Sequence, residues 1–230
     1  MTQKNVALIV GAGPQLGLSL GKRFGQFGLT PVLCSRGVAR LKDLVASLPG
    51  AIAFPCDATN EAAVNAMVDE LEAQHGPIDA CVYNPGSGLS RVPVVDQTAA
   101  KFEDVWRLTA YGGFLVGRAV ARKMVPRGRG AIFFTGATAS VRGGVGFSAF
   151  ASGKFALRAL AQSMARELQP KGIHVVHVVI DGAIGAAGAG PGDGSSFDPD
   201  EIASTYAGLY AQGKSNWTHE LDIRPWNEKW

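Results

Sequence analysis

The chain has 230 residues, 47% of them hydrophobic, with 22 Lys and Arg residues against 19 Asp and Glu residues and a net charge of +3. This length and composition suit one globular domain that buries a substantial core. The basic residues are scattered along the sequence, so it lacks the clustered positive charge that binds nucleic acid or an anionic membrane surface.

The sequence also argues against a membrane span, secretion and a metal centre. No segment approaches the roughly 18–20 uninterrupted apolar residues that cross a bilayer. The N-terminal residues run into a strand pattern without the features of a signal peptide. The three cysteines, Cys34, Cys56 and Cys81, lie in apolar segments without a C-x-x-C pair, as reduced cytosolic thiols do. We therefore expect a cytoplasmic protein without a metal site.

Strand and helix patterns alternate along most of the chain. Val6 to Val10 is a continuous apolar run ended by Gly11, as in a strand buried on both faces. Helical spacing follows over 16–27. Further patterns predict strands over 31–35, 51–57, 78–84, 130–136 and 173–180, and helices over 38–48, 60–75, 99–125 and 149–169. This alternation implies βαβ units, and therefore a single α/β domain over residues 1–230, with three layers around a doubly wound parallel sheet.

The composition changes after Asp181, where a Gly-rich loop extends over about 183–197. It follows the carboxyl end of a strand, the edge at which open α/β sheets bind ligands. We expect this loop to cover the substrate. A short helix near 199–211 and a C-terminal tail complete the chain, and the tail tryptophans are expected to serve packing or subunit contacts.

The glycine-rich turn after the first strand is the first indication of a ligand. It comprises Gly11, Gly13, Gln15, Leu16 and Gly17 and leads directly into a helix. Free N–H groups and the helix dipole attract a phosphate at such a position, and glycines let the backbone approach it. An ordinary tight turn is the alternative. The strand before it and the helix after it favour dinucleotide binding.

The end of the next strand bears on which dinucleotide is bound. Ser35 and Arg36 stand where an acidic residue would hold the ribose 2′-hydroxyl of NAD. Ser35 can hydrogen-bond and Arg36 can pair with a 2′-phosphate, so NADP is favoured over NAD. Alternatively, Arg36 is a solvated loop charge.

Together these segments resemble the short-chain dehydrogenase/reductase family over nearly the whole chain. The resemblance also rests on Asn84-Pro85-Gly86, on the spacing of Phe150 and Lys154, and on Asp181-Gly182. It implies that Asp57 and Ala58 face the adenine, that Asn84 and Gly86 lie beside the riboses, and that the segment with Gly182 and Ile184 meets the nicotinamide amide. Gln15 replaces the family's middle glycine.

The resemblance implies a degraded catalytic tetrad. The family uses Tyr as the proton donor or acceptor, Lys to lower its pKa and hold the nicotinamide ribose, Ser to fix the substrate oxygen, and Asn to orient a water. By motif position, Phe150 occupies the Tyr site, Lys154 the Lys site and Thr109 the Asn site. Ala137 falls at the Ser site, with Thr138 next to it. Only the Lys is retained.

Two functions remain open from the sequence. The first is an NADP-dependent oxidoreductase with a divergent proton donor, acting on a small carbonyl, an imine or an activated alkene. The second is a catalytically inactive nucleotide-binding or regulatory protein on the same scaffold. The retained cofactor positions favour the enzyme. The wide apolar stripes of helices 99–125 and 149–169, together with the resemblance, predict a homodimer or homotetramer.

Overall fold

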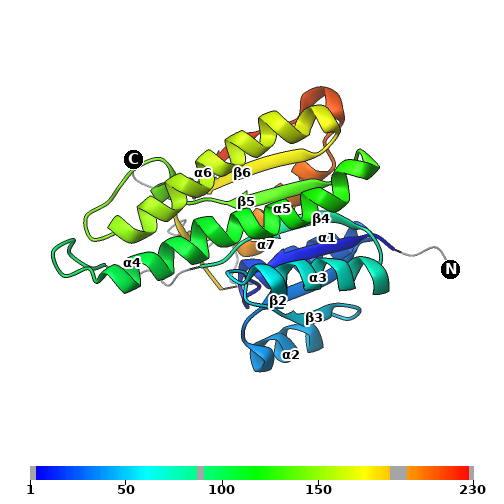
Figure 1. Cartoon of the computed structure of the whole chain (residues 1–230), viewed down its shortest axis with the longest axis horizontal. Helices are drawn as coiled ribbons and strands as arrows, with labels where there is room; N and C mark the ends of the chain where they lie inside the picture. Colours follow the sequence, from blue (N-terminus) through cyan, green and yellow to red (C-terminus); the bar gives the residue numbers. More distant parts are fainter. Residues whose placement is uncertain (1–3, 87–90, 187–195, 228–230) are drawn as a thin grey trace.

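A sheet of seven parallel strands runs through the computed structural model, in the order β3-β2-β1-β4-β5-β6-β9 (Figure 1). The structure describes residues 4–86, 91–186 and 196–227. The strands are β1 (Val6–Val10), β2 (Thr30–Ser35), β3 (Ile52–Pro55), β4 (Ile78–Tyr83), β5 (Ala131–Thr135), β6 (His174–Ile180) and β9 (Glu220–Ile223). The predicted α/β fold is therefore confirmed.

Helices cover both faces of the sheet because alternate side chains of the inner strands are apolar on both sides. In β1, Val6, Leu8 and Val10 point to one face, whereas Ala7 and Ile9 point to the other. The first face packs on α3 (Glu61–Gln74), α5 (Gly112–Met124) and α6 (Ser148–Leu168). The second packs on α1 (Leu16–Gln26), α2 (Val38–Ala46) and α7 (Pro199–Tyr210).

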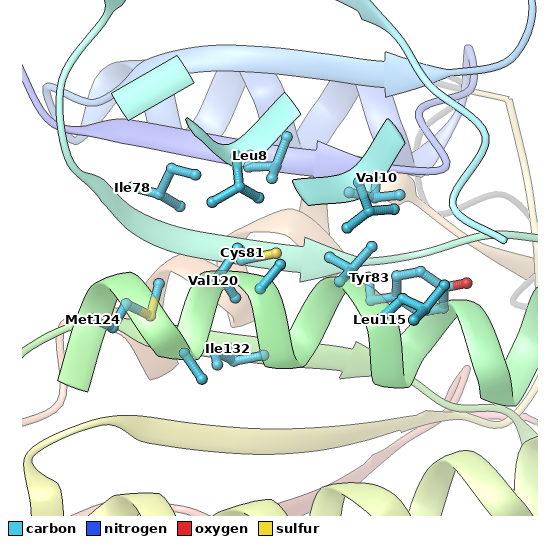
Figure 2. Packing of buried hydrophobic residues seen from close by; sticks show 14 of the residues in the cluster. Leu8, Val10, Ile78, Cys81, Tyr83, Leu115, Val120, Met124 and Ile132 are labelled. Atoms are coloured by element: carbon cyan, nitrogen blue, oxygen red, sulfur yellow. The ribbon is translucent and has the colours of Figure 1, made fainter. Parts of the chain in front are cut away.

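The first face holds the larger of the two core clusters. Figure 2 shows side chains of β1, β4 and β5 meeting those of α5, with Leu8, Cys81 and Ile132 on the strands and Leu115 and Val120 on the helix. All five are almost completely buried. Full burial of an aliphatic side chain contributes about 1.5–3 kcal/mol, so this layer fixes how the helices lie on the sheet.

The predicted helix over 99–125 is a continuous helical run with a wider turn in its middle. It consists of α4 (Ala99–Trp106), a π-helical turn η1 (Arg107–Tyr111) and α5. The buried Tyr83 hydroxyl donates to the Leu108 backbone carbonyl inside this turn. Thr109 packs so closely on α6 that a Cβ added to Gly153 would lie 2.9 Å from the Thr109 Cβ. The turn therefore brings Thr109 against the middle of α6.

The structure places a seventh strand, β9, in the segment that the sequence assigns to an irregular tail. This strand has only four residues, ELDI, and two of them are charged, so their pattern alone does not predict a strand. Tertiary contacts hold it instead. Glu220 accepts from Nε and Nη2 of Arg158, each at 2.7 Å, and its carboxylate lies 3.0 Å from His177 Nδ1. Trp217, just before the strand, stacks on His174 at 4.8 Å, as the expected packing role requires.

A second, two-stranded sheet pairs β7 (Ala183–Ile184) with β8 (Ser196–Phe197). These strands bound the central part of the predicted Gly-rich loop. Residues 187–195 of that loop lie outside the described residues. The predicted substrate loop is therefore described only at its two ends.

The order of the strands changes direction across the sheet between β1 and β4. β2 and β3 extend the sheet on one side of β1, and β4 to β6 extend it on the other. Asn84 N donates to Val10 O at 2.8 Å just beyond the two strands. This is the topological switch point, where open α/β sheets leave a crevice for ligands.

Two glycines of the turn after β1 differ in what a side chain would meet, which gives a matched pair of variants. Gly11 has φ +82°, and an added Cβ would lie 2.5 Å from the Pro85 backbone nitrogen, whereas at Gly13 nothing lies within 4 Å. Left-handed backbone costs a non-glycine residue about 1–3 kcal/mol. We therefore expect Gly11→Ala to lose about 2 kcal/mol or more of unfolding free energy and Gly13→Ala to lose less than about 0.5 kcal/mol. Urea unfolding measures both, and equal losses would contradict the packing described for Gly11.

Candidate functional site

A cleft of about 530 Å³ opens at the switch point. Its walls come from the glycine-rich turn, the end of β2, the segments after β3 and β4, and the segment after β6. Most of the predicted cofactor residues line it, namely Gly11, Gly13, Gln15, Leu16, Gly17, Ser35, Arg36, Ala58, Asn84, Gly86 and Ile184. Asp57, Lys154 and Gly182 do not appear among its lining residues.

The turn is held against β2 by its own backbone. Gly11 N and Ala12 N both donate to the Cys34 carbonyl oxygen, at 2.8 and 3.0 Å. Gly17 allows the first turn of α1 to approach the same segment, because a Cβ there would lie 2.7 Å from Ala12 Cα. Gln15 is the N-cap of α1, and no side chain caps that helix. The Leu18 N–H donates to the Gly13 carbonyl at 2.9 Å, but no side-chain oxygen caps the start of α1, an arrangement that favours an anion at the first two N–H groups.

Gln15, which stands at the position of the family's middle glycine, extends its side chain across the cleft. Its Nε2 donates to the backbone oxygens of both Ile184 and Gly185, each at 2.9 Å. The side-chain amide therefore joins the glycine-rich turn to the segment that follows β6. Sequence reasoning identified Gln15 as a departure from the glycine pattern but gave no indication of this bridge.

The end of the cleft at β2 is positively charged. Arg36, just before α2, lines it, and so does Arg40 in the first turn of α2. Ser35 Oγ is buried in this wall and has no hydrogen-bond partner among the described residues. Sequence reasoning missed Arg40, which lies in the first turn of α2, shortly after the Ser35-Arg36 segment.

Asp57 has a structural role beside the cleft. Its Oδ1 accepts from Thr59 N at 2.9 Å and from Thr59 Oγ1 at 2.8 Å. The Thr59 backbone N–H is the main cause that lowers the pKa of Asp57, with smaller contributions from the Thr59 hydroxyl, Arg36 and Arg107. The carboxylate is therefore charged and shapes the approach to α3.

Phe150 and Lys154 lie side by side on α6, as their spacing predicts. The Lys154 Nζ is 5.6 Å from the centre of the Phe150 ring and donates to the Thr135 carbonyl at 2.7 Å. The lysine is only 5% exposed, and burial lowers its pKa to about 8. Thr135 is the last residue of β5, so the ammonium is fixed at the carboxyl edge of the sheet.

The hydroxyl of Thr138 is engaged by an acid. Thr138 Oγ1 donates to Oδ1 of Asp181, a buried residue at the end of β6. The Asp181 carboxylate also lies 3.9 Å from Arg142 and 3.5 Å from Arg224. Thr138, Asp181 and these two arginines thus form a polar cluster across the ends of β5 and β6. The sequence analysis named Asp181 as part of the Asp181-Gly182 segment, but gave no indication of its bond to Thr138 across two strand ends.

The remaining predicted residues are packed. Thr109 is 2% exposed and contacts Gly153, as described for the π-helical turn. Gly182 has φ +153°, and an added Cβ would lie 2.8 Å from Pro225 Cδ. The backbone of Gly182 is therefore held against the segment after β9.

Two further findings concern the described part of the chain only. Within residues 4–86, 91–186 and 196–227, no group of three His, Cys, Asp or Glu side chains is arranged to bind a metal ion. None of the helices described there combines the length and the apolar character that a membrane crossing needs.

Known proteins resemble this chain in sequence and in structure. Residues 5–187 match the family model for short chain dehydrogenase. A short-chain dehydrogenase from Rhodopseudomonas palustris is 41% identical, with a TM-score of 0.86 over 98% of this chain and 100% of that one. Secoisolariciresinol dehydrogenase from Forsythia intermedia is 33% identical over 178 residues, which cover 74% of this chain and only 62% of that protein.

Two other solved structures are each 25% identical to this chain. One is a metagenomic short-chain oxidoreductase in complex with NADP, with a TM-score of 0.81 over 96% of this chain and 97% of that one. The other is an NAD⁺-bound xylitol dehydrogenase, with a TM-score of 0.87 over 98% of this chain and 100% of that one. Since the family model matches well over half of the sequence, this chain belongs to the short-chain dehydrogenase/reductase family of oxidoreductases.

Proposed function

We propose that the chain is an NADP-dependent oxidoreductase that acts on a small carbonyl, an imine or an activated alkene. The observation that carries this proposal is the cleft, where the uncapped start of α1 and the Arg36 and Arg40 side chains surround one space. The start of α1 favours an anionic group in one part of that space, and the two arginines favour one in another part. A dinucleotide with a pyrophosphate and a 2′-phosphate presents such groups.

The residues of the cleft fit this cofactor. An added Cβ at Gly13 would meet no atom within 4 Å, so the turn leaves open space above its backbone. The buried Ser35 hydroxyl, which lacks a partner among the described residues, can bond to the ribose or its phosphate. Arg36 and Arg40 can pair with the 2′-phosphate. Asn84 and Gly86 would adjoin the riboses, and Ile184 the nicotinamide end.

Bound nicotinamide would supply hydride-transfer chemistry, and the protein would position it. Lys154, fixed by the Thr135 carbonyl, would hold its ammonium near the ribose. Phe150, in the family's Tyr position, carries no proton to donate. Thr138 already directs its hydroxyl proton to Asp181. Neither side chain is therefore a good proton donor. We propose substrates that need little protonation, such as iminium ions and enones, in preference to simple ketones.

Turnover tests the proposed activity. We expect the purified protein to oxidise NADPH with an iminium ion or an enone faster than with a simple ketone, because general acid catalysis contributes about 10²–10⁴-fold where it is present. Phe150→Tyr should raise ketone reduction selectively. Absorbance at the NADPH band measures the rate with each substrate, for the wild type and for the variant.

Phe147→Tyr is the matched control, because it adds a phenol seven rather than four residues before Lys154. It should leave ketone reduction unchanged. NADPH binding without turnover of any of these compounds would contradict the enzyme and favour a non-catalytic nucleotide-binding protein.

Cofactor preference tests the role of Arg36. We expect Arg36→Ala to weaken NADPH binding by about 10- to 150-fold, the effect of losing a charged hydrogen bond of about 1.5–3 kcal/mol. NADH, which lacks the 2′-phosphate, should bind the variant and the wild type alike. Fluorescence titration measures both, with Arg122→Ala on the exposed side of α5 as the control. Equal losses for both nucleotides would argue against a 2′-phosphate contact.

We also propose that two or four copies of the chain associate through α4, α5 and α6. Four large aromatic side chains on these helices are partly exposed, namely Phe102 at 36%, Trp106 at 38%, Phe114 at 38% and Phe155 at 43%. A second copy would bury them. Light scattering should give twice or four times the 24.0 kDa chain mass, and Phe155→Asp should lower it. A monomeric wild type would disprove the association.

A further inference from the structure

We propose that the substrate carries a carboxylate, and that Arg142 binds this group at the carboxyl edge of β5 and β6. Arg91, from the segment after β4, adds positive charge at the same edge. The inference rests on the function proposed above and narrows its substrates to singly charged carbonyl compounds, imines or activated alkenes. Arg142 is then the residue that selects the substrate, while Lys154 keeps its place beside the cofactor.

Arg142 lies at the same edge of the sheet as Lys154. It follows the short helix η3 (Thr138–Ser140), which comes after β5 and packs against α6. Arg142 N donates to the Thr138 carbonyl at 3.1 Å, so Arg142 is one turn beyond Thr138. Its Nη2 is 3.9 Å from Asp181 Oδ1, the oxygen that accepts the Thr138 hydroxyl. The guanidinium therefore lies near that hydroxyl, next to the family's Ser position.

The Arg142 guanidinium has hydrogen-bond donors left for a ligand. Its side chain is 54% exposed, and within the described part of the chain it donates no hydrogen bond and has one ion pair, the 3.9 Å contact with Asp181. Arg158, by contrast, donates two bonds of 2.7 Å to one carboxylate. Asp181 also has closer partners, since Thr138 donates to it and the more buried Arg224 is 3.5 Å away. Arg142 can therefore bind a second carboxylate without leaving Asp181 unpaired.

A second arginine reaches this edge from the segment after β4. Val92 N donates to Gly146 O at 2.9 Å, which joins that segment to the loop before α6. The Arg91 guanidinium lies 5.2 Å from the centre of the Phe147 ring, and among the residues that the structure describes no acid pairs with it. Phe147 is the N-cap of α6 and provides no side-chain cap, so the start of that helix is also positive. These positive groups lie one turn from Phe150, on the segment that leads into α6.

A carboxylate suits this arrangement better than a phosphate. A guanidinium can donate two parallel hydrogen bonds to the two oxygens of a carboxylate. Asp181, 3.9 Å from the same guanidinium, repels a second negative charge on the ligand. A group with one negative charge is therefore favoured over a doubly charged one.

Two matched enones test the carboxylate site. 4-Oxopent-2-enoate and pent-3-en-2-one share one enone and differ by a carboxylate in place of a methyl group. The measured quantity is the ratio of their kcat/KM values with NADPH, because comparing this ratio between two proteins cancels the different reactivities of the enones. We expect Arg142→Ala to lower the ratio about tenfold, the lower end for a charged hydrogen bond, since Arg142 is half exposed.

The rate with pent-3-en-2-one is an internal control, because it should stay close to the wild-type value if Arg142→Ala folds normally. Arg166→Ala is the matched control variant, since Arg166 is an exposed arginine three turns beyond Lys154 on α6. It should leave the ratio unchanged. Reduction of both enones with the same ratio in the wild type and in Arg142→Ala would refute the carboxylate site and leave the proposed function in place.

Binding of an unreactive analogue separates this inference from the proposed function. Saturation-transfer NMR with NADP⁺ present should detect 4-oxopentanoate on the wild type and a weaker signal on Arg142→Ala, whereas pentan-2-one should give equal signals on both. Binding of 4-oxopentanoate that depends on Arg142, in a protein that reduces neither enone, would support the carboxylate site and refute the proposed enzyme. A 4-oxopentanoate signal that is equal in both proteins, or absent from both, would overturn the carboxylate site.

Discussion

The site depends on the contact between the turn after β1 and the backbone around it. Gly11 has left-handed φ, donates to the Cys34 carbonyl and lies against Pro85, so the ends of β1, β2 and β4 meet at one point. A side chain there has no room. Because this arrangement directs the start of α1 at the open edge of the sheet, the cleft follows from the backbone geometry of the switch point.

The sequence predicts what local patterns determine and fails where contacts join distant segments. Strands such as β1 are recognisable because apolar residues fill both faces, and the glycine turn because few other residues fit it. β9 is invisible in the sequence, since Arg158 and His177 hold Glu220 from other elements. The bond between Thr138 and Asp181 likewise depends on how the ends of β5 and β6 align, which no spacing within the sequence reveals.

The chemistry of the site is divided between two regions. The cleft at β1, β2 and β4 has the glycines, the helix start without a side-chain cap and the basic side chains that suit the proposed dinucleotide. The edge at β5 and β6 holds Lys154 beside a phenyl ring, and the Thr138 hydroxyl at that edge is already bonded to a carboxylate. In the proposed function, cofactor binding and proton transfer thus fall to different residues at different strand ends.

Gln15 has a consequence for how a ligand reaches the cleft. Its amide joins two walls through bonds to the Ile184 and Gly185 oxygens, both at an exposed position. Breaking two such bonds costs about 1–3 kcal/mol in water, so the bridge is open in roughly one molecule in six to one in 160 at any moment. Rotation of this one side chain would therefore separate the turn after β1 from the segment after β6 during ordinary fluctuations, while the strands and helices around it stay in place.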